Sequence, residues 1–515
     1  MNAFPLLGTL ILTPAIAALF AARARSDERA RRVALLGAAL TLLLSLLPLA
    51  LSHAGVALTA GGPTLPLLGA RLRLGLDGFT ITLLPLLGVV LLALLAASPR
   101  AAIDPPSAAA LLATGSAILG VFCAVDLAVL AAAWVAALVP VERLVASKGA
   151  EDPLLRRTCR IFLLGGTAPL VVAIGAIAVL AARQGAALPF DVEEIARAGV
   201  PEAWQSPLFA LVGIAVLMRM AAVPFHGWLP VLLERGPLGV TILLAQMQVG
   251  VCVLVRVGVT LLPVGSADGM PILAVLGLIS ALHGAVLALV QTDLRRLLGY
   301  LVASQKGLVL LGVASLSPQS VSGALLQSVA LSIAITGLAM VVGAIEARAG
   351  TADTRELGGL VARTPRMAAF FFLLACAMIG MPGALSFVSE DLLLHGILHA
   401  HPVLAVLALT AAALNGITLF RAFQRTFLGP LRRHLKGAAL EALVLRERAF
   451  LLALVALTLV LGVAPARLIS IHAPVVERVV HDVAHGAQSR VAAAANRRSI
   501  DADGRAPRRD GRPSP

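Results

Sequence analysis

The chain has 515 residues, of which 59% are hydrophobic and 13% charged, and its mean hydropathy is +0.95. A water-soluble globular protein carries about 25% charged residues, so this composition excludes that class and indicates a protein whose solvent is lipid. The formal net charge of +14 would suggest nucleic acid in a soluble protein, but here most Lys and Arg lie between apolar segments, as in membrane proteins.

Apolar segments long enough to cross a bilayer as helices recur along the whole chain. The first of them has no basic residues before its apolar run, so we expect a membrane helix there and no cleaved signal peptide. We expect about fourteen spans, with cores at 3–22, 33–52, 78–98, 107–124, 126–145, 160–182, 206–229, 238–262, 271–291, 296–315, 320–345, 367–396, 402–428 and 449–470.

Basic residues concentrate in alternate loops, beginning with RARSDERARR at 23–32. The positive-inside rule places these loops in the cytoplasm and the N-terminus outside, which predicts a multi-pass protein of the cell (inner) membrane. After the last span, 471–487 is predicted to form a short amphipathic helix. Residues 488–515, polar and rich in Arg, Asp and Pro, are predicted to be disordered.

Two of the predicted spans contain a helix-breaking segment. MAAVPFHGWLP carries Pro224 and Pro230, and IGMPGALSF carries Pro382 between two glycines. Each is the fourth span of a group of five, which is typical of inverted-repeat transporters, although ordinary proline kinks would give the same residues. The predicted division is 1–98 for the first three helices, 99–263 and 264–430 for the two repeats, 431–487 for the last helix with the amphipathic segment, and 488–515 for the tail.

Ionisable side chains inside apolar spans are costly and usually serve ion movement. The candidate ion-translocating residues are Arg219 and His226 around the first break, His283 and Lys306 inside two spans, and Glu390 after the second break. Lys, His and carboxylates can exchange protons, whereas Arg stays charged and can act only as a fixed counter-charge. For His283, a hydrogen-bonded packing role is the alternative.

No cofactor site is predicted in this chain. The four cysteines, Cys123, Cys159, Cys252 and Cys376, are scattered without a CxxC pair, so neither zinc nor an iron–sulfur cluster is indicated. Nothing resembles a GxGxxG turn between a strand and a helix, so no dinucleotide site is indicated either.

Several blocks resemble a known family: AVLALVQTDLRRLLGYLVASQKG (285–307), RMAAVPFHGWLP (219–230), RELGGLVARTP (355–365), GMPGALSFVSEDLLL (380–394) and FRAFQRTFLGP (420–430). Together they are similar to the antiporter-like membrane subunits of NADH:quinone oxidoreductase, complex I, of M (subunit 4) or L (subunit 5) type. Multi-subunit cation/proton antiporters, membrane-bound hydrogenases and some inorganic-carbon uptake systems share this superfamily. Pro224, Trp228, Asp293, Arg295 and Pro382 carry the match in the most specific blocks.

The resemblance implies fourteen helices with two inverted repeats, a row of ionisable residues along the membrane midplane, and contacts to other membrane subunits. NADH, flavin, iron–sulfur clusters and quinone would then belong to partner subunits. By position, Arg219 stands where the family has its broken-helix lysine. Glu390 matches the acidic or basic residue after the second break, and His226 belongs to the PFHxWLP block.

Three positions depart from the family pattern. Val135 replaces the fifth-helix glutamate, Gln248 stands at the eighth-helix lysine position, and Ile335 falls near the eleventh-helix lysine. Lys306 is an additional charge and could replace the missing lysine if the helices are neighbours.

We therefore expect a proton- or cation-translocating membrane subunit of a complex I-like enzyme, a translocase subunit without a redox site of its own. Two alternatives stay open: the membrane subunit of a two-component proton-coupled transporter of the inorganic-carbon or antiporter type, and a non-conducting scaffold subunit.

Overall fold

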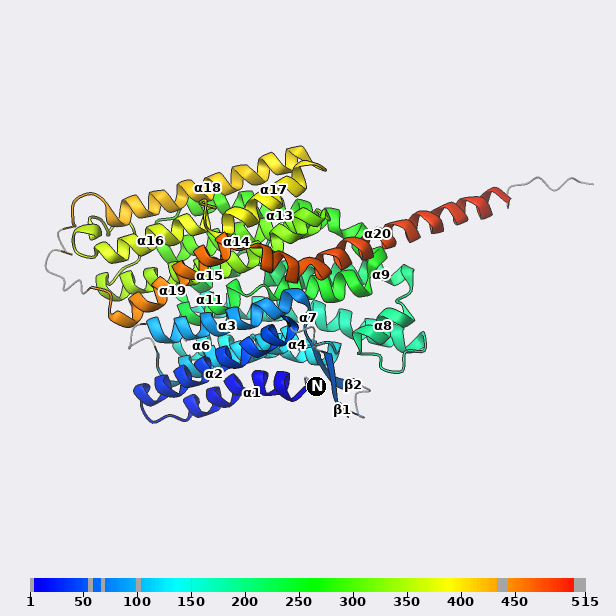
Figure 1. The fold of residues 1–515 in the computed structure, drawn as a ribbon, viewed down its shortest axis with the longest axis horizontal. Coiled ribbons are helices and arrows are strands. Elements are labelled where there is room, and N and C mark those ends of the chain that lie inside the picture. Colours follow the sequence, from blue (N-terminus) through cyan, green and yellow to red (C-terminus); the bar gives the residue numbers. More distant parts are fainter. Residues whose placement is uncertain are drawn as a thin grey trace, which may run out of the picture.

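The computed structural model describes residues 4–53, 59–65, 70–98, 103–149, 151–432, 435 and 442–503, and this part of the chain is almost entirely helical (Figure 1). The prediction of an all-α membrane fold is confirmed. The N-terminal part consists of α1 (Phe4–Ala22), α2 (Asp27–His53), β1 (Thr59–Leu65), β2 (Ala70–Gly75) and α3 (Gly78–Ala97).

The first predicted repeat contains α4 (Pro105–Cys123), α5 (Leu127–Ala136), α6 (Val139–Lys148), α7 (Pro153–Arg183), α8 (Val192–Ala198), α9 (Glu202–Arg219), α10 (Trp228–Arg235), α11 (Leu238–Gln246), α12 (Val249–Val253) and the π-helical η3 (Leu254–Val259). The second contains α13 (Pro263–Val290), α14 (Leu294–Ala314), α15 (Pro318–Ala349), the short η4 (Leu360–Ala362), α16 (Pro365–Met378), α17 (Leu385–Leu398) and α18 (Pro402–Phe427). Two helices follow, α19 (Leu445–Val463) and α20 (Ala466–Asp503).

Aspartate marks the start of many of these helices. The carboxylate accepts hydrogen bonds from the first free backbone N–H groups and complements the positive end of the helix dipole. The capping residues are Asp77 for α3, Asp104 for α4, Asp126 for α5, Asp152 for α7, Asp191 for α8 and Asp293 for α14.

The long helices lie side by side in one bundle (Figure 1). In this view α1 and α2 form one flank, and α16 and α18 form the opposite flank, with α14 and α15 between them. The hairpin β1–β2 and α8 lie at one end of the bundle, and α20 runs out beyond it at the same end. The hairpin was not predicted, although RLRLG at 71–75 shows the alternation of a strand.

Within the described residues, eleven helices are long and apolar enough to cross a membrane, or twelve if the bent pair α19–α20 is one span. The broken helices α9–α10 and α16–α17 are not among them. This test does not confirm the predicted count of about fourteen. Helix α20 continues to Asp503, so its backbone is helical in part of the segment predicted to be disordered; residues 504–515 lie outside the described residues.

The centre of the bundle is α14, which is buried from Leu297 to its end at Ala314. It packs on α13 with backbone close to backbone, because a Cβ on Gly277 would lie 2.9 Å from the Gly307 carbonyl oxygen and one on Gly284 would lie 2.7 Å from the Ser304 nitrogen. Small residues permit such close helix packing in a membrane. The tight pair fixes the polar face of α14, which includes Lys306, inside the protein.

Candidate functional site

The first helix break lies between Arg219, the last residue of α9, and Trp228, the first residue of α10. The Trp228 Nε1–H donates to the Met218 carbonyl oxygen at 2.8 Å, and its ring stacks on Phe162 with centroids 3.7 Å apart. The Val223 N–H donates to Ser280 Oγ on α13 at 2.8 Å. The PFHGWLP block therefore holds the two half-helices together around a non-helical turn that leaves carbonyl groups of α9 without helical partners.

Arg219 is buried in this break, with 1% of its surface exposed. Its guanidinium lies over the Trp134 ring, 4.9 Å from the centroid, and Trp134 is fixed by a hydrogen bond from Nε1 to the Gly166 carbonyl oxygen at 2.6 Å. Among the described residues, none accepts a hydrogen bond from Arg219 Nε, Nη1 or Nη2. The cation thus rests on an aromatic face without a carboxylate, and the neighbouring Val135 supplies none.

Lys306 comes to the same break from α14. It is 1% exposed, and its Nζ lies 3.5 Å from the carbonyl oxygen of Arg219. This carbonyl is at the C-terminal end of α9, where the helix dipole is negative and favours a cation. The sequence placed both residues in apolar spans, and the structure brings them together.

The second helix break lies between α16 and α17, and Glu390 follows it on α17. Gln327 on α15 donates from Nε2 to Glu390 Oε1 at 3.3 Å and to Gln305 Oε1 at 2.8 Å, and Ser389 Oγ donates to Gln327 Oε1. Gln305 precedes Lys306 on α14. Hydrogen bonds therefore link Gln305 on α14 through Gln327 on α15 to the carboxylate beside the second break, and Lys306, the next residue along α14, reaches the first break. We call these four residues the polar row, although no hydrogen bond among the described residues joins Lys306 to Gln305.

Glycine shapes the space around this carboxylate. Gly380, two residues before Pro382, has φ +73° and lies so close that an added Cβ would be 2.6 Å from Glu390 Oε2. Both the backbone conformation and the space require glycine here.

The two histidines meet at a different place. His226 Nε2 and His283 Nε2 lie 3.1 Å apart, and the rings meet edge to face with centroids 4.6 Å apart. His283 lies on α13 and is exposed. No interaction among the described residues joins this pair to Lys306.

The departures from the family pattern leave neutral side chains in the interior. Gln248 stands at the N-cap position of α12 without a capping hydrogen bond from its side chain. It is fully buried, and neither amide atom has a hydrogen-bond partner among the described residues. Ile335 is fully buried on α15. Sequence reasoning missed Gln305, Gln327 and Ser389, whose only signal was a polar side chain in an apolar span.

The TDLRR block serves the structure around the site. Asp293 Oδ1 accepts from the Arg296 N–H at 2.8 Å and caps α14. Arg295 donates from Nε to the Leu233 carbonyl oxygen at 2.6 Å and from Nη2 to that of Gly236, and pairs with Glu346 on α15 at 3.1 Å. Arg295 therefore ties the C-terminal end of α10 to α14 and α15.

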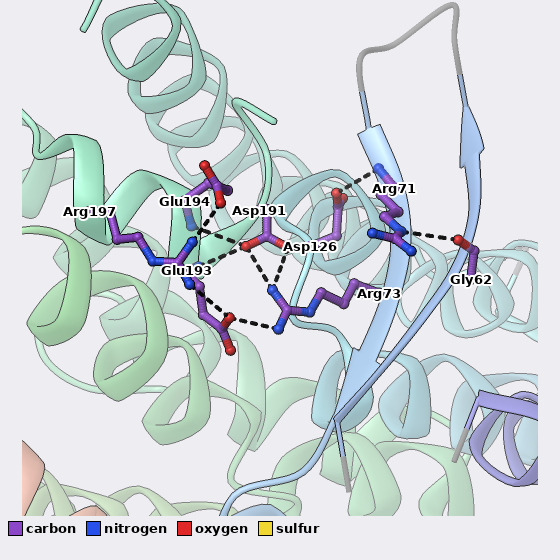
Figure 2. A network of polar contacts seen from close by, with 8 residues as sticks. All are labelled: Gly62, Arg71, Arg73, Asp126, Asp191, Glu193, Glu194 and Arg197. Carbon is purple, nitrogen blue, oxygen red and sulfur yellow. Dashed lines mark hydrogen bonds and ion pairs between the residues drawn. The ribbon is translucent and has the colours of Figure 1, made fainter. Parts of the chain in front are cut away.

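A polar network holds the end of the bundle that carries the hairpin (Figure 2). Arg73 on β2 pairs with Asp191, the N-cap residue of α8, at 2.9 Å and with Glu193 on α8 at 2.6 Å. The Arg71 N–H donates to Asp126 Oδ2 at 3.3 Å. Asp126 is fully buried, and this burial raises the pKa of its carboxyl above the usual range. The network fixes the hairpin to α5 and α8.

Within the described residues, no group of three or more His, Cys, Asp or Glu side chains comes together in a way that could hold a metal ion. All four cysteines are buried and free.

Known proteins resemble this chain both in sequence and in fold. The family model "NADH:quinone oxidoreductase/Mrp antiporter, TM" matches residues 124–415. F(420)H(2) dehydrogenase subunit M of Methanosarcina mazei is 30% identical over 82% of this chain and 88% of its own length. NADH-quinone oxidoreductase subunit 13 of Thermus thermophilus is 32% identical over 84% of this chain and 91% of its own. A chain of respiratory complex I from Thermus thermophilus with bound NADH superposes with a TM-score of 0.84 at 26% identity, covering 93% of this chain and 99% of that one.

Proposed function

This chain belongs to the NADH:quinone oxidoreductase/Mrp antiporter family of membrane proteins, and we propose that it is a proton- or cation-translocating subunit of a complex I-like NADH:quinone oxidoreductase. Its partners would be other membrane subunits of that assembly, and NADH, flavin, iron–sulfur clusters and quinone would be bound by partner subunits. The relatives named as oxidoreductase subunits support this assignment, as does the likeness to a chain of respiratory complex I.

The observation that carries the proposal is the buried polar row with Lys306 at one end and Glu390 at the other. Gln327 links Gln305 to Glu390 by hydrogen bonds, and Lys306 follows Gln305 along α14. Its two ends ionise, whereas the amides between them can only donate and accept hydrogen bonds. In this proposal, Lys306 and Glu390 hold the translocated proton in turn. Gln305 and Gln327 orient the carboxylate, and water carries the proton between the two ends.

Arg219 has the role of a fixed charge in this scheme. It cannot release a proton, and its guanidinium rests on Trp134 without a hydrogen-bonded carboxylate among the described residues. Two buried cations near one helix end, without an acid, are costly to hold at the same time. In this proposal, Lys306 therefore takes up a proton when a negative charge lies close to the first break.

The missing glutamate of the first repeat supports a second candidate function. Because Val135 stands where the family has glutamate, the first repeat lacks the acid–base pair that would let it conduct on its own. If the row in the second repeat is also inactive, the chain is a scaffold subunit. A membrane subunit of a two-component transporter would differ from both in its partner.

Partner identity tests the assignment directly. The tagged chain is purified from its own membranes in mild detergent, and the proteins that accompany it are identified by mass spectrometry. We expect further membrane subunits together with redox subunits of a complex I-like enzyme. A single large soluble protein without redox subunits would contradict the assignment and support the two-component transporter.

A further inference from the structure

A groove of about 770 Å³ lies on one flank of the bundle, outside the polar row. It runs between α1, α4 and the α5–α6 segment, and alanine is the commonest residue in its lining. The alanines Ala132 and Ala136 on α5 and Ala22 on α1 are exposed in it. An open apolar groove with small side chains on its floor can receive a long apolar chain.

The depth of the groove matches one leaflet of a bilayer. Its lining on α1 extends from Ile11 to Ala22, which is about 16 Å at the rise of an α-helix. Half of the hydrocarbon core of a bilayer is about 15 Å thick. The lining on α4 begins at Pro106, close to the start of that helix.

The mouth of the groove carries a positive charge. Arg143 and Ser147 on α6 line it at the end where α1 finishes and α4 begins. Arg143 is exposed and forms no ion pair with the described residues, whereas the nearby Lys148 is neutralised by Asp104 at 2.8 Å. The groove is therefore cationic at the membrane surface and apolar along its depth.

We propose that this groove binds an anionic phospholipid, with one acyl chain along α1, α4 and α5 and the headgroup phosphate at Arg143. Like such a lipid, the groove has a charged end at the membrane surface and an apolar part below it. Arg is well suited to bind a phosphate. A transmembrane helix of a partner subunit would fill the apolar part as well, but it would have to bring its own acid to Arg143.

Lipid retention tests the proposal. The purified full-length chain is incubated with equal amounts of phosphatidylglycerol and phosphatidylcholine of the same acyl chains, separated from free lipid, and the bound lipids are counted. We expect a preference for phosphatidylglycerol of about fivefold, the effect of one Arg near a membrane surface.

Two kinds of variant distinguish binding of the lipid headgroup from binding of its acyl chain. Arg143→Gln should bring the ratio of the two lipids close to one, with Arg157→Gln, an exposed arginine outside the groove, as its control. Ala132→Leu and Ala136→Leu fill the groove and should lower the retention of both lipids, with the exposed Ala413→Leu on α18 as control. All these positions are exposed, so the variants are expected to fold, and an unchanged gel-filtration profile checks this.

Three outcomes of the lipid-retention measurements would overturn the proposal. The first is an unchanged lipid preference in Arg143→Gln, and the second is unchanged retention in both alanine variants. The third is displacement of phosphatidylglycerol by excess inorganic phosphate, because it would show that only the headgroup charge is bound. A photo-crosslinker placed at Ala132 in native membranes gives the complementary result: a lipid adduct is expected, and a protein adduct would assign the groove to a partner helix instead.

Discussion

Replacing Arg295 by alanine should destabilise the protein far more than the same change at its neighbour Arg296. The Arg295 side chain is 12% exposed and serves three partners: the carbonyl oxygens of Leu233 and Gly236 at the end of α10, and the carboxylate of Glu346. Its loss leaves two carbonyl groups and a partly buried carboxylate without their cation. Leaving buried carbonyl groups without their charged donor costs about 1–3 kcal/mol, and the ion pair to the partly exposed Glu346 adds about 1 kcal/mol or less.

Arg296 offers a matched control, since it is 40% exposed and pairs with Glu234 at 3.4 Å. An exposed pair contributes about 1 kcal/mol or less. The assay is unfolding of the purified chain in mixed detergent micelles, followed by tryptophan fluorescence, with the free energy of unfolding compared among wild type, Arg295→Ala and Arg296→Ala. Equal losses in the two variants would refute the view that the TDLRR block acts by fixing the broken helix.

Three further predictions concern single side chains. Arg219→Lys should keep proton flux in reconstituted liposomes, because a fixed cation is all that is needed there. It should lower the free energy of unfolding by about 1 kcal/mol, because lysine makes the weaker contact with the Trp134 ring. A strong loss of flux would point to a carboxylate that only arginine can pair with. Because burial raises the pKa of Asp126, its contribution to stability is complete below about pH 4 and is lost as the pH rises through the folded-state pKa. The free energy of unfolding of wild type minus that of Asp126→Asn should therefore fall over this range, and a flat difference would contradict the reasoning. Gly380→Ala places a Cβ 2.6 Å from Glu390 Oε2 and should reduce proton flux. The control Gly383→Ala, at φ +94° with open space around it, carries similar backbone strain and should leave flux unchanged. Equal flux in both variants would count against a role for the Glu390 carboxylate.

The membrane class and both helix breaks could be predicted from the sequence, because apolar length and proline are local signals. Lys306 and Glu390 could be singled out for the same reason, since a charge in an apolar span is conspicuous wherever its partner lies. Their connection could not be predicted. Gln305, Gln327 and Ser389 are neutral and come from three helices, and only packing shows that they share one row.

Long-range partners explain the other gaps. Arg256 lies within a predicted span, yet it pairs with Asp77 at 2.7 Å and binds carbonyl groups at the end of α4. These contacts join residues more than a hundred positions apart, so no periodicity reveals them. The hairpin β1–β2 escaped prediction because two short strands outside the apolar spans leave only a weak alternating pattern.

Proton flux through the reconstituted assembly is the measurement that tests the central claim most directly. Lys306→Ala and Glu390→Gln should each abolish flux while the assembly stays intact by gel filtration. Lys148→Ala and Asp391→Asn, which change exposed residues of the same charge, should leave flux unchanged. Unchanged flux in both Lys306→Ala and Glu390→Gln would contradict the proposed path and leave the chain without the conducting role assigned to it.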